Sequence, residues 1–406
     1  MPGRTGPCLT NLTLLLVSGL MGIGLTEGAL RALLPSARGY YSLMPGTNRS
    51  FDVPPGLLPG VAGRVRYRVN RYGIRGRLFG PDGAEYRILA VGGSTTECLV
   101  LDDTLAWPYL LEAGLDRTAD GRRAWVGNVG RSGKTARDHV VQIKHLLTWY
   151  PRIDAVIVLV GANDLVKTLQ QGFDYGAPRP ITEPAAEAEQ LQSAFVSLPG
   201  TLQGAGGSSA RPWFRETAVW QLARRAKLAW QHRSRWGAGD GGIARVRRVR
   251  AQVDHPIDSL PPLDAPLAEY RANLEAIIAV ARAAGVRLVF MTQPTLWHEH
   301  LSPALERLLW FGWVGTREPD STTAFFTTSA LARGMSRYNA TLLSVCADAG
   351  VECIDVAGFL PPDTTVFYDD MHFNEAGSRQ LAELLQDHFA RRPPFARLGF
   401  GNEEWQ

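Results

Sequence analysis

The chain has 406 residues, of which 45% are hydrophobic and 20% are charged. These are ordinary values for a globular protein, so they exclude a wholly disordered chain and allow a large buried core. The net charge of +4 is small for this length, and we therefore expect no nucleic-acid partner.

Four cysteines, at positions 8, 98, 346 and 353, follow neither a CxxC nor a zinc-ligand spacing. We therefore expect no metal and no cofactor. Cys346 and Cys353 form a disulfide if this part of the chain is exported, and remain two buried thiols if it is not.

Residues 1–34 contain an uncharged, largely apolar stretch from Thr5 to Thr26, which is about long enough to cross a bilayer as a helix. A membrane anchor and a cleaved secretory signal both fit this pattern, and the lack of an A-x-A-type cleavage site favours the anchor. A buried helix of a cytosolic protein is the remaining alternative. If the segment is an anchor, we expect the rest of the chain to lie in the periplasm or outside the cell.

Residues 35–85 are interpreted as a linker and an edge segment. Leu43 to Gly63 is rich in proline and glycine, which is typical of a loop. Arg64 to Asn70 alternates between polar and apolar residues and predicts an edge strand. Its arginines either face solvent or approach an acidic substrate or lipid headgroups.

The main domain, predicted to span residues 86–406, opens with an apolar run from Ile88 to Val91 that predicts a strand buried on both faces. Gly92 and Gly93 end that strand, so Ser94 is the first following residue with a reactive side chain. Open α/β sheets bind ligands at the carboxyl ends of their strands. Ser94 is therefore a candidate nucleophile, with a helix N-cap as the alternative.

Two further apolar strands are predicted, from Ala124 to Val126 and from Asp154 to Val160. The first leads into a glycine-rich turn, where the backbone N–H of Gly133 can face a ligand without a Cβ in the way. The second ends just before Asn163, whose side-chain amide can donate a hydrogen bond. We expect both groups at the same sheet edge as Ser94.

Near the other end of the chain, Asp369 and His372 stand at an i, i+3 spacing, which brings their side chains together if the segment forms a helical turn. A carboxylate held against one imidazole nitrogen leaves the other nitrogen free to take a proton from a hydroxyl, and a serine nucleophile needs such a base. The N–H groups of Ser94 and Gly133 and the Asn163 amide are candidate donors to the oxyanion of an acyl-transfer reaction.

These residues resemble the motifs of the SGNH hydrolase superfamily, also called GDSL-type esterases. Four blocks match in the family's order: Gly92-Gly-Ser94, Asn128 to Gly133, Gly161-Ala-Asn163-Asp164 and Asp369-Asp-Met-His372. The resemblance implies that Ser94 is the nucleophile, His372 the base and Asp369 the acid of a catalytic triad. It also implies an oxyanion hole formed by Ser94, Gly133 and Asn163.

The chain departs from the family pattern at position 93, where glycine replaces the usual aspartate. The apolar N-terminal segment, Asn70 to Arg75 and Thr292 to Trp297 are similar to bacterial, envelope-associated members of the family. Other catalytic layouts do not fit. Thr96 stands where a G-x-S-x-G elbow needs its second glycine, the G-x-G-x-x-G pattern is missing, and Asn128 stands where a phosphate loop needs its first glycine.

The family pattern is absent from about residue 175 to residue 262, which we interpret as a helical insertion. Trp213 to Trp236 has helical periodicity, and further arginines follow at positions 245, 247, 248 and 250. These helices could cap the cleft or lie on a membrane surface, or they could present a solvated face.

Two aromatic and histidine clusters leave alternatives open. Trp297, Trp310 and Trp313 line a sugar-binding cleft or belong to the core. His298 and His300 form an H-x-H pair, which would need a third ligand to hold a metal.

We expect a three-layer α/β/α sandwich with a parallel sheet of about five strands, an N-terminal transmembrane helix and a helical insertion. The leading hypothesis is a membrane-anchored serine esterase that removes an acyl group such as acetyl, with extracytoplasmic carbohydrate as one candidate substrate. Transfer of the acyl group to a sugar hydroxyl would make the same site an O-acyltransferase. A hypothesis from another class is a non-catalytic envelope binding or assembly protein, which we would expect to have lost a triad residue. The oligomeric state is left open.

Overall fold

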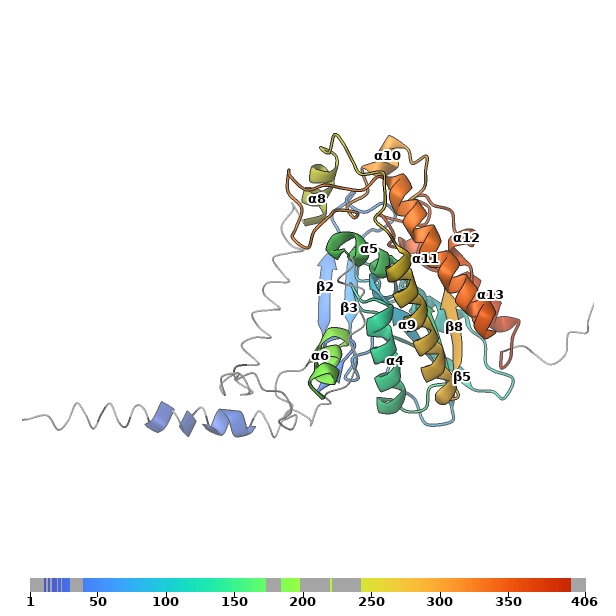
Figure 1. Ribbon diagram of the computed structural model, residues 1–406. Coiled ribbons are helices and arrows are strands. Elements are labelled where there is room, and N and C mark those ends of the chain that lie inside the picture. Colours follow the sequence, from blue (N-terminus) through green and yellow to red (C-terminus); the bar gives the residue numbers. More distant parts are fainter. Residues whose placement is uncertain are drawn as a thin grey trace, which may run out of the picture.

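A five-stranded sheet forms the centre of the computed structural model, which describes residues 39–172, 184–197 and 242–395, some residues between 11 and 29, and Trp220 (Figure 1). All five strands are parallel, in the order β5-β4-β6-β8-β9. Their bounds are β4 Glu85–Gly92, β5 Arg123–Asn128, β6 Ala155–Leu159, β8 Arg287–Met291 and β9 Glu352–Ile354. The prediction of a parallel sheet of about five strands is confirmed.

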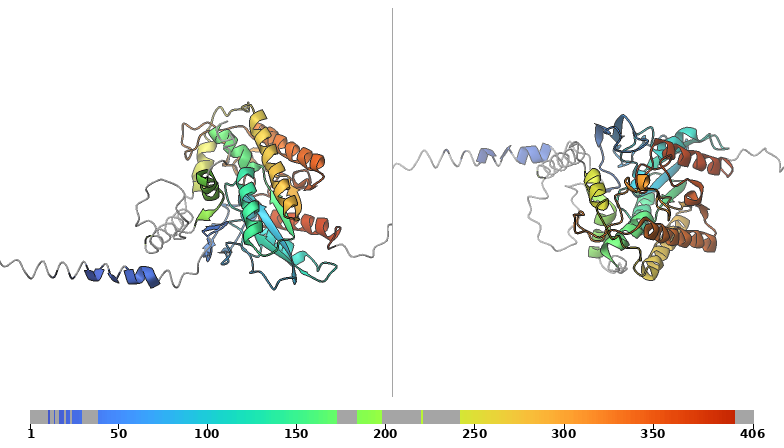
Figure 2. Two further views of the ribbon diagram at one scale, coloured as in Figure 1. Left: turned by 60° about the horizontal axis from the view of Figure 1, so that its bottom comes forward. Right: turned by 90° about the horizontal axis from the view of Figure 1, so that it is seen from above.

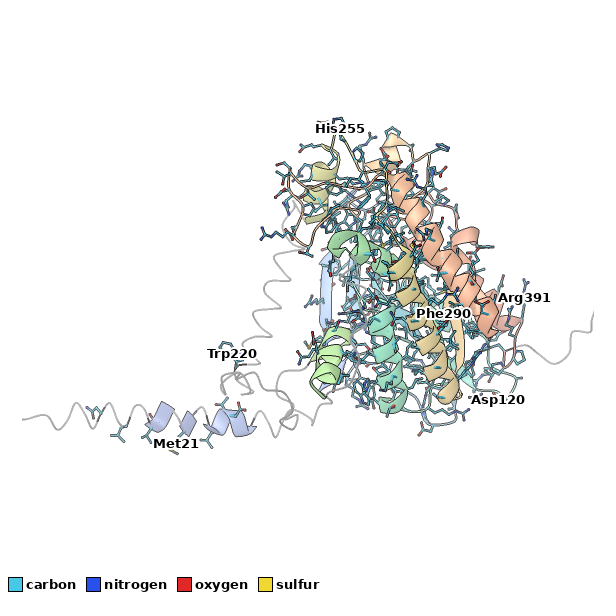
Figure 3. All side chains as sticks on the ribbon, viewed as in Figure 1. Met21, Asp120, Trp220, His255, Phe290 and Arg391 are labelled. Atoms are coloured by element: carbon cyan, nitrogen blue, oxygen red, sulfur yellow. A yellow bond between two sulfur atoms is a disulfide. The ribbon has the colours of Figure 1, made fainter. Side chains whose placement is uncertain are left out.

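The central strands are buried on both faces, as their continuous apolar sequences predict. Every residue of β4 and β6 is buried. Phe290 of β8 lies in the interior of the domain, whereas Asp120 and Arg391 lie at its periphery (Figure 3). Branched and aromatic side chains from the sheet therefore supply the middle layer of the core.

Helices cover both faces of this sheet. On one face α3 (Trp107–Gly114) packs against α13 (Glu375–Ala390), and on the other α9 (Asp264–Ala283) packs between α4 (Ala136–Trp149) and α11 (Thr328–Ala349). Because β5 and β6 lie on opposite sides of β4, right-handed crossovers place α3 and α4 on opposite faces. Figure 2 shows these layers from two further directions.

The strand order reverses at β4, since β5 pairs with one side of this strand and β6 with the other. Such a reversal opens a crevice beyond the carboxyl ends of the two diverging strands. Ser94 begins the helix that follows β4, and Asn163 lies in the first turn of the helix that follows β6, so the topology brings both to this crevice. The remaining short helices are α2 Ser94–Glu97, α5 Ala162–Gln171, α10 Pro303–Glu306 and α12 Val356–Phe359.

The alternating segment that begins at Arg64 is not an edge strand of the main sheet. Instead, β3 (Arg64–Arg68) pairs with β2 (Asn48–Asp52) in a separate antiparallel hairpin. Val65 and Tyr67 are buried, while the arginines that alternate with them are exposed. The alternation thus arises because one face of a hairpin packs onto the domain.

The arginines of this hairpin have acidic partners. Arg66 pairs with Asp102 at 2.9 Å, and Arg68 pairs with Asp103 at 2.7 Å. Hydrogen bonds from Arg66 lower the pKa of the Asp102 carboxyl below its usual value. The ion pairs attach the hairpin to the segment between α2 and α3.

The predicted insertion contains three described elements, α6 (Pro184–Ala194), β7 (Val196–Ser197) and α8 (Gly242–Arg250). Strand β7 pairs with β1 (Tyr40–Tyr41). The helix expected from Trp213 to Trp236 lies outside the described residues apart from Trp220, as does most of the segment 1–34. Within the described residues, no helix combines the length and apolar character needed to span a membrane.

Cys346 at the end of α11 and Cys353 in β9 form a disulfide, which is one of the two alternatives that the sequence left open. The bond joins β9, which lies at the edge of the sheet, to the helix that precedes it in the chain. Cys98 is a free, buried thiol, and burial raises its pKa to about 12. A thiol with so high a pKa is a poor nucleophile near neutral pH.

Candidate active site

Ser94 follows β4 at a turn that has no room for additional side chains. A Cβ on Gly92 would lie 2.6 Å from the carbonyl oxygen of Leu159, and a Cβ on Gly93 would lie 2.3 Å from Nδ2 of Asn163. Glycine at both positions lets the turn pack directly against the end of β6. An aspartate at position 93, as in the family pattern, would displace the Asn163 amide.

His372 contacts Ser94 across 278 residues of sequence. Nε2 of His372 lies 2.7 Å from Oγ of Ser94, and Nδ1 lies 2.8 Å from Oδ2 of Asp369. The Asp369 side chain is completely buried, whereas Ser94 is partly exposed. With its proton on Nδ1, the imidazole presents Nε2 as an acceptor for the serine hydroxyl. The three side chains thus form a hydrogen-bonded chain that ends at an accessible hydroxyl.

The charges around the hydrogen-bonded residues Ser94, His372 and Asp369 favour a basic imidazole. Burial opposes a positive charge on His372, but the Asp369 carboxylate outweighs it and raises the pKa of the imidazole above its usual value. Burial also acts against ionised Asp369, and here the neighbouring His372 keeps the pKa of the carboxyl below its usual value. The geometry therefore pairs an ionised acid with a base strong enough to accept the serine proton.

The sequence predicted that Asp369 and His372 would meet if their segment formed a helical turn. The segment is instead a bend. Oδ1 of Asp369 accepts the backbone N–H groups of Met371 at 3.1 Å and His372 at 2.9 Å. These local bonds fold the chain back on the aspartate, as in an Asx turn, and bring both side chains to one side. Oδ2 also accepts Nε1 of Trp310 at 2.8 Å.

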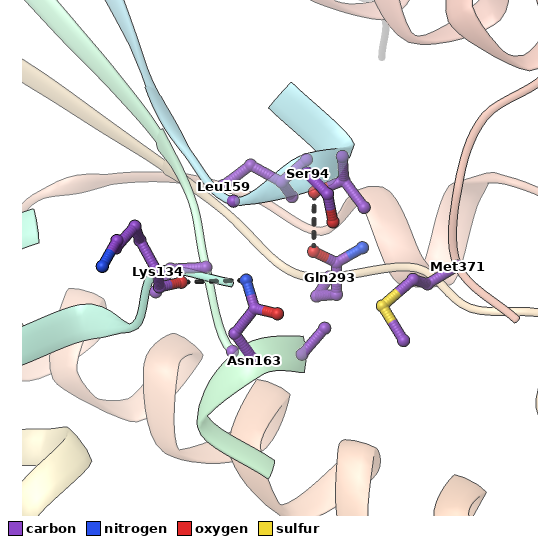
Figure 4. A pocket seen from close by; sticks show the side chains of 11 residues that line it. Ser94, Lys134, Leu159, Asn163, Gln293 and Met371 are labelled. Carbon is purple, nitrogen blue, oxygen red and sulfur yellow. Dashed lines mark hydrogen bonds between the residues drawn. The ribbon is translucent and has the colours of Figure 1, made fainter. Parts of the chain in front are cut away.

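Asn163 lies at the start of α5 and lines the same hollow as Ser94 (Figure 4). Its Nδ2 donates one hydrogen to the carbonyl of Lys134 at 2.9 Å, which fixes the amide and leaves its second hydrogen for a ligand. Gly133 precedes Lys134 and has a φ of +74°. In the part of the chain that the structure describes, the N–H groups of Ser94 and Gly133 donate to no acceptor. Ser94 and Asn163 thus share the hollow, and Gly133 lies beside it.

Glu97, which the sequence did not single out, holds the loop that carries Gly133. Its Oε2 accepts the N–H of Ser132 at 2.8 Å and the hydroxyl of the same residue at 2.6 Å, and its Oε1 accepts the Tyr67 hydroxyl at 2.8 Å. On the other side of the loop, Asp164 accepts the first N–H of α4 at 3.0 Å. The helix that begins with the serine therefore also fixes the loop that carries Gly133.

The hollow beside Ser94 has a volume of about 220 Å³, part of which is open to solvent. Small or polar residues such as Thr95, Ala162 and Gln293 line it together with the apolar residues Leu159, Val160 and Met371 (Figure 4). Oγ1 of Thr95 donates to Oε1 of Gln293 at 3.3 Å. The space directly at the serine suits a small substituent.

The three tryptophans considered for a sugar cleft have other contacts. Nε1 of Trp297 donates to Oδ1 of Asp370 at 2.8 Å, and Nε1 of Trp310 donates to Asp369. Trp313 stacks on Phe311 with ring centroids 6.0 Å apart. Two of the three indoles therefore support the carboxylates next to the imidazole.

The histidine pair considered for a metal finds no third ligand. Within the described residues, no group of three or more histidine, cysteine or acidic side chains is arranged to hold a metal ion. His298 and His300 lie at the surface, and Nδ1 of His298 accepts the N–H of His300 at 3.3 Å.

No protein-family model matches the chain, and no curated protein matches it. Several solved structures do. A lipolytic protein of the G-D-S-L family from Veillonella parvula is 11% identical, with a TM-score of 0.38, over 76% of this chain and 100% of that chain. The acetylxylan esterase Axe2 from Geobacillus stearothermophilus is 14% identical, with a TM-score of 0.37, over 76% and 95% of the two chains. The M. smegmatis aryl esterase is 12% identical, with a TM-score of 0.37, over 75% and 97%.

The chain resembles the SGNH hydrolases. All four sequence blocks converge on one edge of a parallel α/β sheet, with the serine, histidine and aspartate in one hydrogen-bonded chain.

Proposed function

We propose that the chain is a serine esterase that hydrolyses short acyl esters through an acyl-enzyme. The observation that carries this proposal is the 2.7 Å contact between Nε2 of His372 and Oγ of Ser94, with Asp369 on the opposite imidazole nitrogen. A free serine hydroxyl is a poor nucleophile near neutral pH, and this arrangement supplies the base that activates it. A non-catalytic binding protein would have no need of an intact triad.

In the proposed reaction, Nε2 of His372 takes the proton from Ser94 as Oγ attacks the acyl carbon. The carbonyl oxygen becomes negative and accepts hydrogen bonds from the N–H groups of Ser94 and Gly133 and from the Asn163 amide. The protonated imidazole then gives its proton to the departing alcohol, which leaves an acyl-serine. Water, deprotonated by the same imidazole, attacks this ester and releases the acid and free Ser94.

The substrate acyl group in this proposal is small, such as acetyl. The hollow at Ser94 has a volume of about 220 Å³ that includes space open to solvent, and Gln293 and Met371 line it. Thr95 donates its hydroxyl hydrogen to Gln293, and its backbone carbonyl accepts Nε1–H of Trp107, so hydrogen bonds hold this wall. A long acyl chain would have to leave the hollow and lie on the protein surface.

The acyl-length proposal is tested with p-nitrophenyl acetate and p-nitrophenyl decanoate, together with a serine-directed phosphonate. We expect kcat/KM to favour acetate by roughly 10-fold or more, because the longer chain gains little contact in the hollow. The phosphonate should label the peptide that contains Ser94. Faster decanoate hydrolysis would contradict the small acyl pocket, and absence of both turnover and labelling would contradict the esterase proposal. Acetate appearing on an added sugar hydroxyl instead of in water would identify an O-acyltransferase.

We further propose that the domain is exported and anchored by its N-terminal segment, with an acetylated carbohydrate of the cell envelope as substrate. Two observations support export and anchoring. The segment from Thr5 to Thr26 is apolar and uncharged, and the Cys346–Cys353 disulfide is of a kind that persists in oxidising compartments.

The location is tested in intact cells by trapping thiols with acid and alkylating them before and after reduction. We expect Cys346 and Cys353 to be alkylated only after reduction, and the chain to stay in the membrane fraction after a salt wash. Buried Cys98 serves as the internal control, since it should be alkylated in denatured protein without reduction. Alkylation of Cys346 and Cys353 without reduction, or a chain released by salt, would contradict export with an anchor.

A further inference from the structure

Helix α8, in the insertion that the family pattern does not cover, contacts the loop of the acid–base pair through its arginines. It lies at the upper end of the molecule in Figure 1. The side chain of Arg247 donates to three carbonyl oxygens: those of Leu57 at 2.8 Å, Leu308 at 2.8 Å and Tyr368 at 3.1 Å. Tyr368 immediately precedes Asp369. The rigid, planar guanidinium therefore joins three distant segments, one of which continues into the catalytic acid.

Arg250, one helical turn further along, holds the segment that bonds the carboxylates. It donates to the carbonyl of Phe311 at 2.7 Å. The N–H groups of Trp310 and Phe311 donate in turn to Oδ2 of Asp370 at 2.7 and 3.2 Å. The Trp310 side chain donates to Asp369 at 2.8 Å. Arg250 thus fixes a short segment, Trp310 and Phe311, that donates hydrogen bonds to both Asp369 and Asp370.

Asp369 and Asp370 are adjacent and both completely buried, so two negative charges compete in one small volume. Burial and the charge of Asp369 raise the pKa of Asp370. Burial lowers the pKa of both arginines. The carboxylates of Asp369 and Asp370 favour the charged form of Arg247, and those of Asp370 and Glu306 favour the charged form of Arg250. Uncompensated buried charge is costly, and these two arginines are the positive groups that offset it from α8.

We propose that Arg247 and Arg250 are positioning residues for the catalytic pair, acting through the loop of Asp369 and Asp370. They fix the carboxylate against His372 and offset its negative field. One alternative from the sequence was that these arginines form a solvated helical face. Arg247 and Arg250 do not fit it, because they donate to backbone carbonyls. The inference rests on the proposed esterase function, because it makes the insertion a working part of that site.

The sign of the expected pH effect follows from the charges around the imidazole. The groups that face His372 are Asp369 and Asp370 on its own loop, the ring of Tyr368 stacked on it, and Ser94 and Glu97 from α2. The positive charge of Arg247 interacts with the carboxylates of Asp369 and Asp370. Removing that charge leaves their negative field less compensated, which stabilises the imidazolium and raises the pKa of His372 further. The base form is then lost at a higher pH.

The experiment compares Arg247→Met and Arg247→Lys with Arg245→Met in the full chain. Arg247→Met should lower kcat for p-nitrophenyl acetate by roughly 10-fold with KM within about 2-fold, and should move the acidic limb of the kcat profile to higher pH by about 0.5 unit or more. Arg247→Lys keeps the charge but lacks the planar fork, so it should lower kcat while leaving the acidic limb in place. Arg245 is on the same helix but pairs with exposed Glu318 at 2.8 Å, and its variant should match the wild type.

The pKa of His372 is also followed by NMR of histidine-labelled protein, with the signal assigned by its loss in His372→Ala. This measurement needs no turnover, so it separates failure of the inference from failure of the esterase proposal. A higher His372 pKa in Arg247→Met would support the positioning role even in a protein without esterase activity. An unchanged pKa and pH limb, with only a lower melting temperature, would overturn the inference. If Arg247→Met does not fold, a kcat of Arg247→Lys equal to that of Arg245→Met would overturn it.

Discussion

Replacing Ser94 by alanine should lower kcat for an aryl acetate by at least about 10⁴-fold, because the substitution removes the atom that forms the acyl-enzyme. The effect on the fold should be small. In the described part of the chain, the Ser94 hydroxyl makes one hydrogen bond, to Nε2 of His372, and losing such a bond costs on the order of 1 kcal/mol. The measurement pairs steady-state kinetics with thermal unfolding.

Ser132→Ala provides a matched control for the serine variant. This serine lies nearby and bonds Glu97 through its hydroxyl at 2.6 Å, but its backbone N–H also donates to the same carboxylate at 2.8 Å. The alanine variant keeps the second bond, so we expect a loss in kcat of less than about 10-fold and unchanged phosphonate labelling. A Ser94→Ala enzyme with wild-type turnover would remove the serine from the mechanism.

The central sheet could be predicted because the local sequence pattern is enough to identify its strands. Ile88 to Val91 and Asp154 to Val160 are continuous apolar runs, and such runs are buried on both faces in a parallel sheet. Each run is followed by a glycine, with a polar residue two positions after it, so the positions of Ser94 and Asn163 at one sheet edge follow from topology. The segment from Arg64 to Asn70 shows the limit of this reasoning. Its alternation indicates that one face is buried, but it does not indicate which strand pairs with it.

The contacts that support the site could not be predicted, because they join segments far apart in the sequence. Glu97 and Ser132 are separated by 35 residues, and Trp310 and Asp369 by 59. No spacing rule connects such positions. Glutamate, serine, tryptophan and aspartate are also common outside active sites, so their presence alone does not indicate these contacts. Tryptophan near a hydrolase site suggests a sugar platform, yet the indole of Trp310 is a hydrogen-bond donor to a buried carboxylate.

The arginines of the insertion illustrate the same point for charge. Arginines at positions 245, 247, 248 and 250 look alike in the sequence and are typical of a solvated helical face. The structure separates them by partner: Arg245 pairs with an exposed glutamate, whereas Arg247 and Arg250 donate to backbone carbonyls around the triad. Only the fold of the neighbouring loops distinguishes a surface charge from one that supports the site.

Replacing Asp369 by asparagine should lower kcat near neutral pH by about 10⁴-fold, the loss associated with a wrong imidazole tautomer. All groups around this carboxylate are donors. Oδ1 accepts the N–H groups of Met371 and His372, while Oδ2 accepts Nε1 of Trp310 at 2.8 Å and Nδ1 of His372 at 2.8 Å. An ionised aspartate satisfies all of them, since both of its oxygens are acceptors only.

Asparagine can offer an oxygen at only one of these positions. If its oxygen takes the two backbone N–H groups, its NH₂ points at Nδ1 of His372. The imidazole then accepts at Nδ1 and carries its proton on Nε2, the nitrogen that must receive the proton of Ser94. The variant therefore keeps the size of the side chain, but its NH₂ can no longer accept Nε1–H of Trp310, and the imidazole presents the serine with a donor in place of a base.

The matched control is Trp310→Phe, which removes one donor to Asp369 and keeps the carboxylate and the imidazole tautomer. We expect a loss in kcat of about 10-fold or less, since a single neutral hydrogen bond is removed. Both variants are compared by steady-state kinetics and by phosphonate labelling, which reports serine reactivity directly. Asp369→Asn should label far more slowly than Trp310→Phe. If the two variants lose activity and labelling to the same extent, the aspartate contributes packing around Trp310 and not the tautomer of His372.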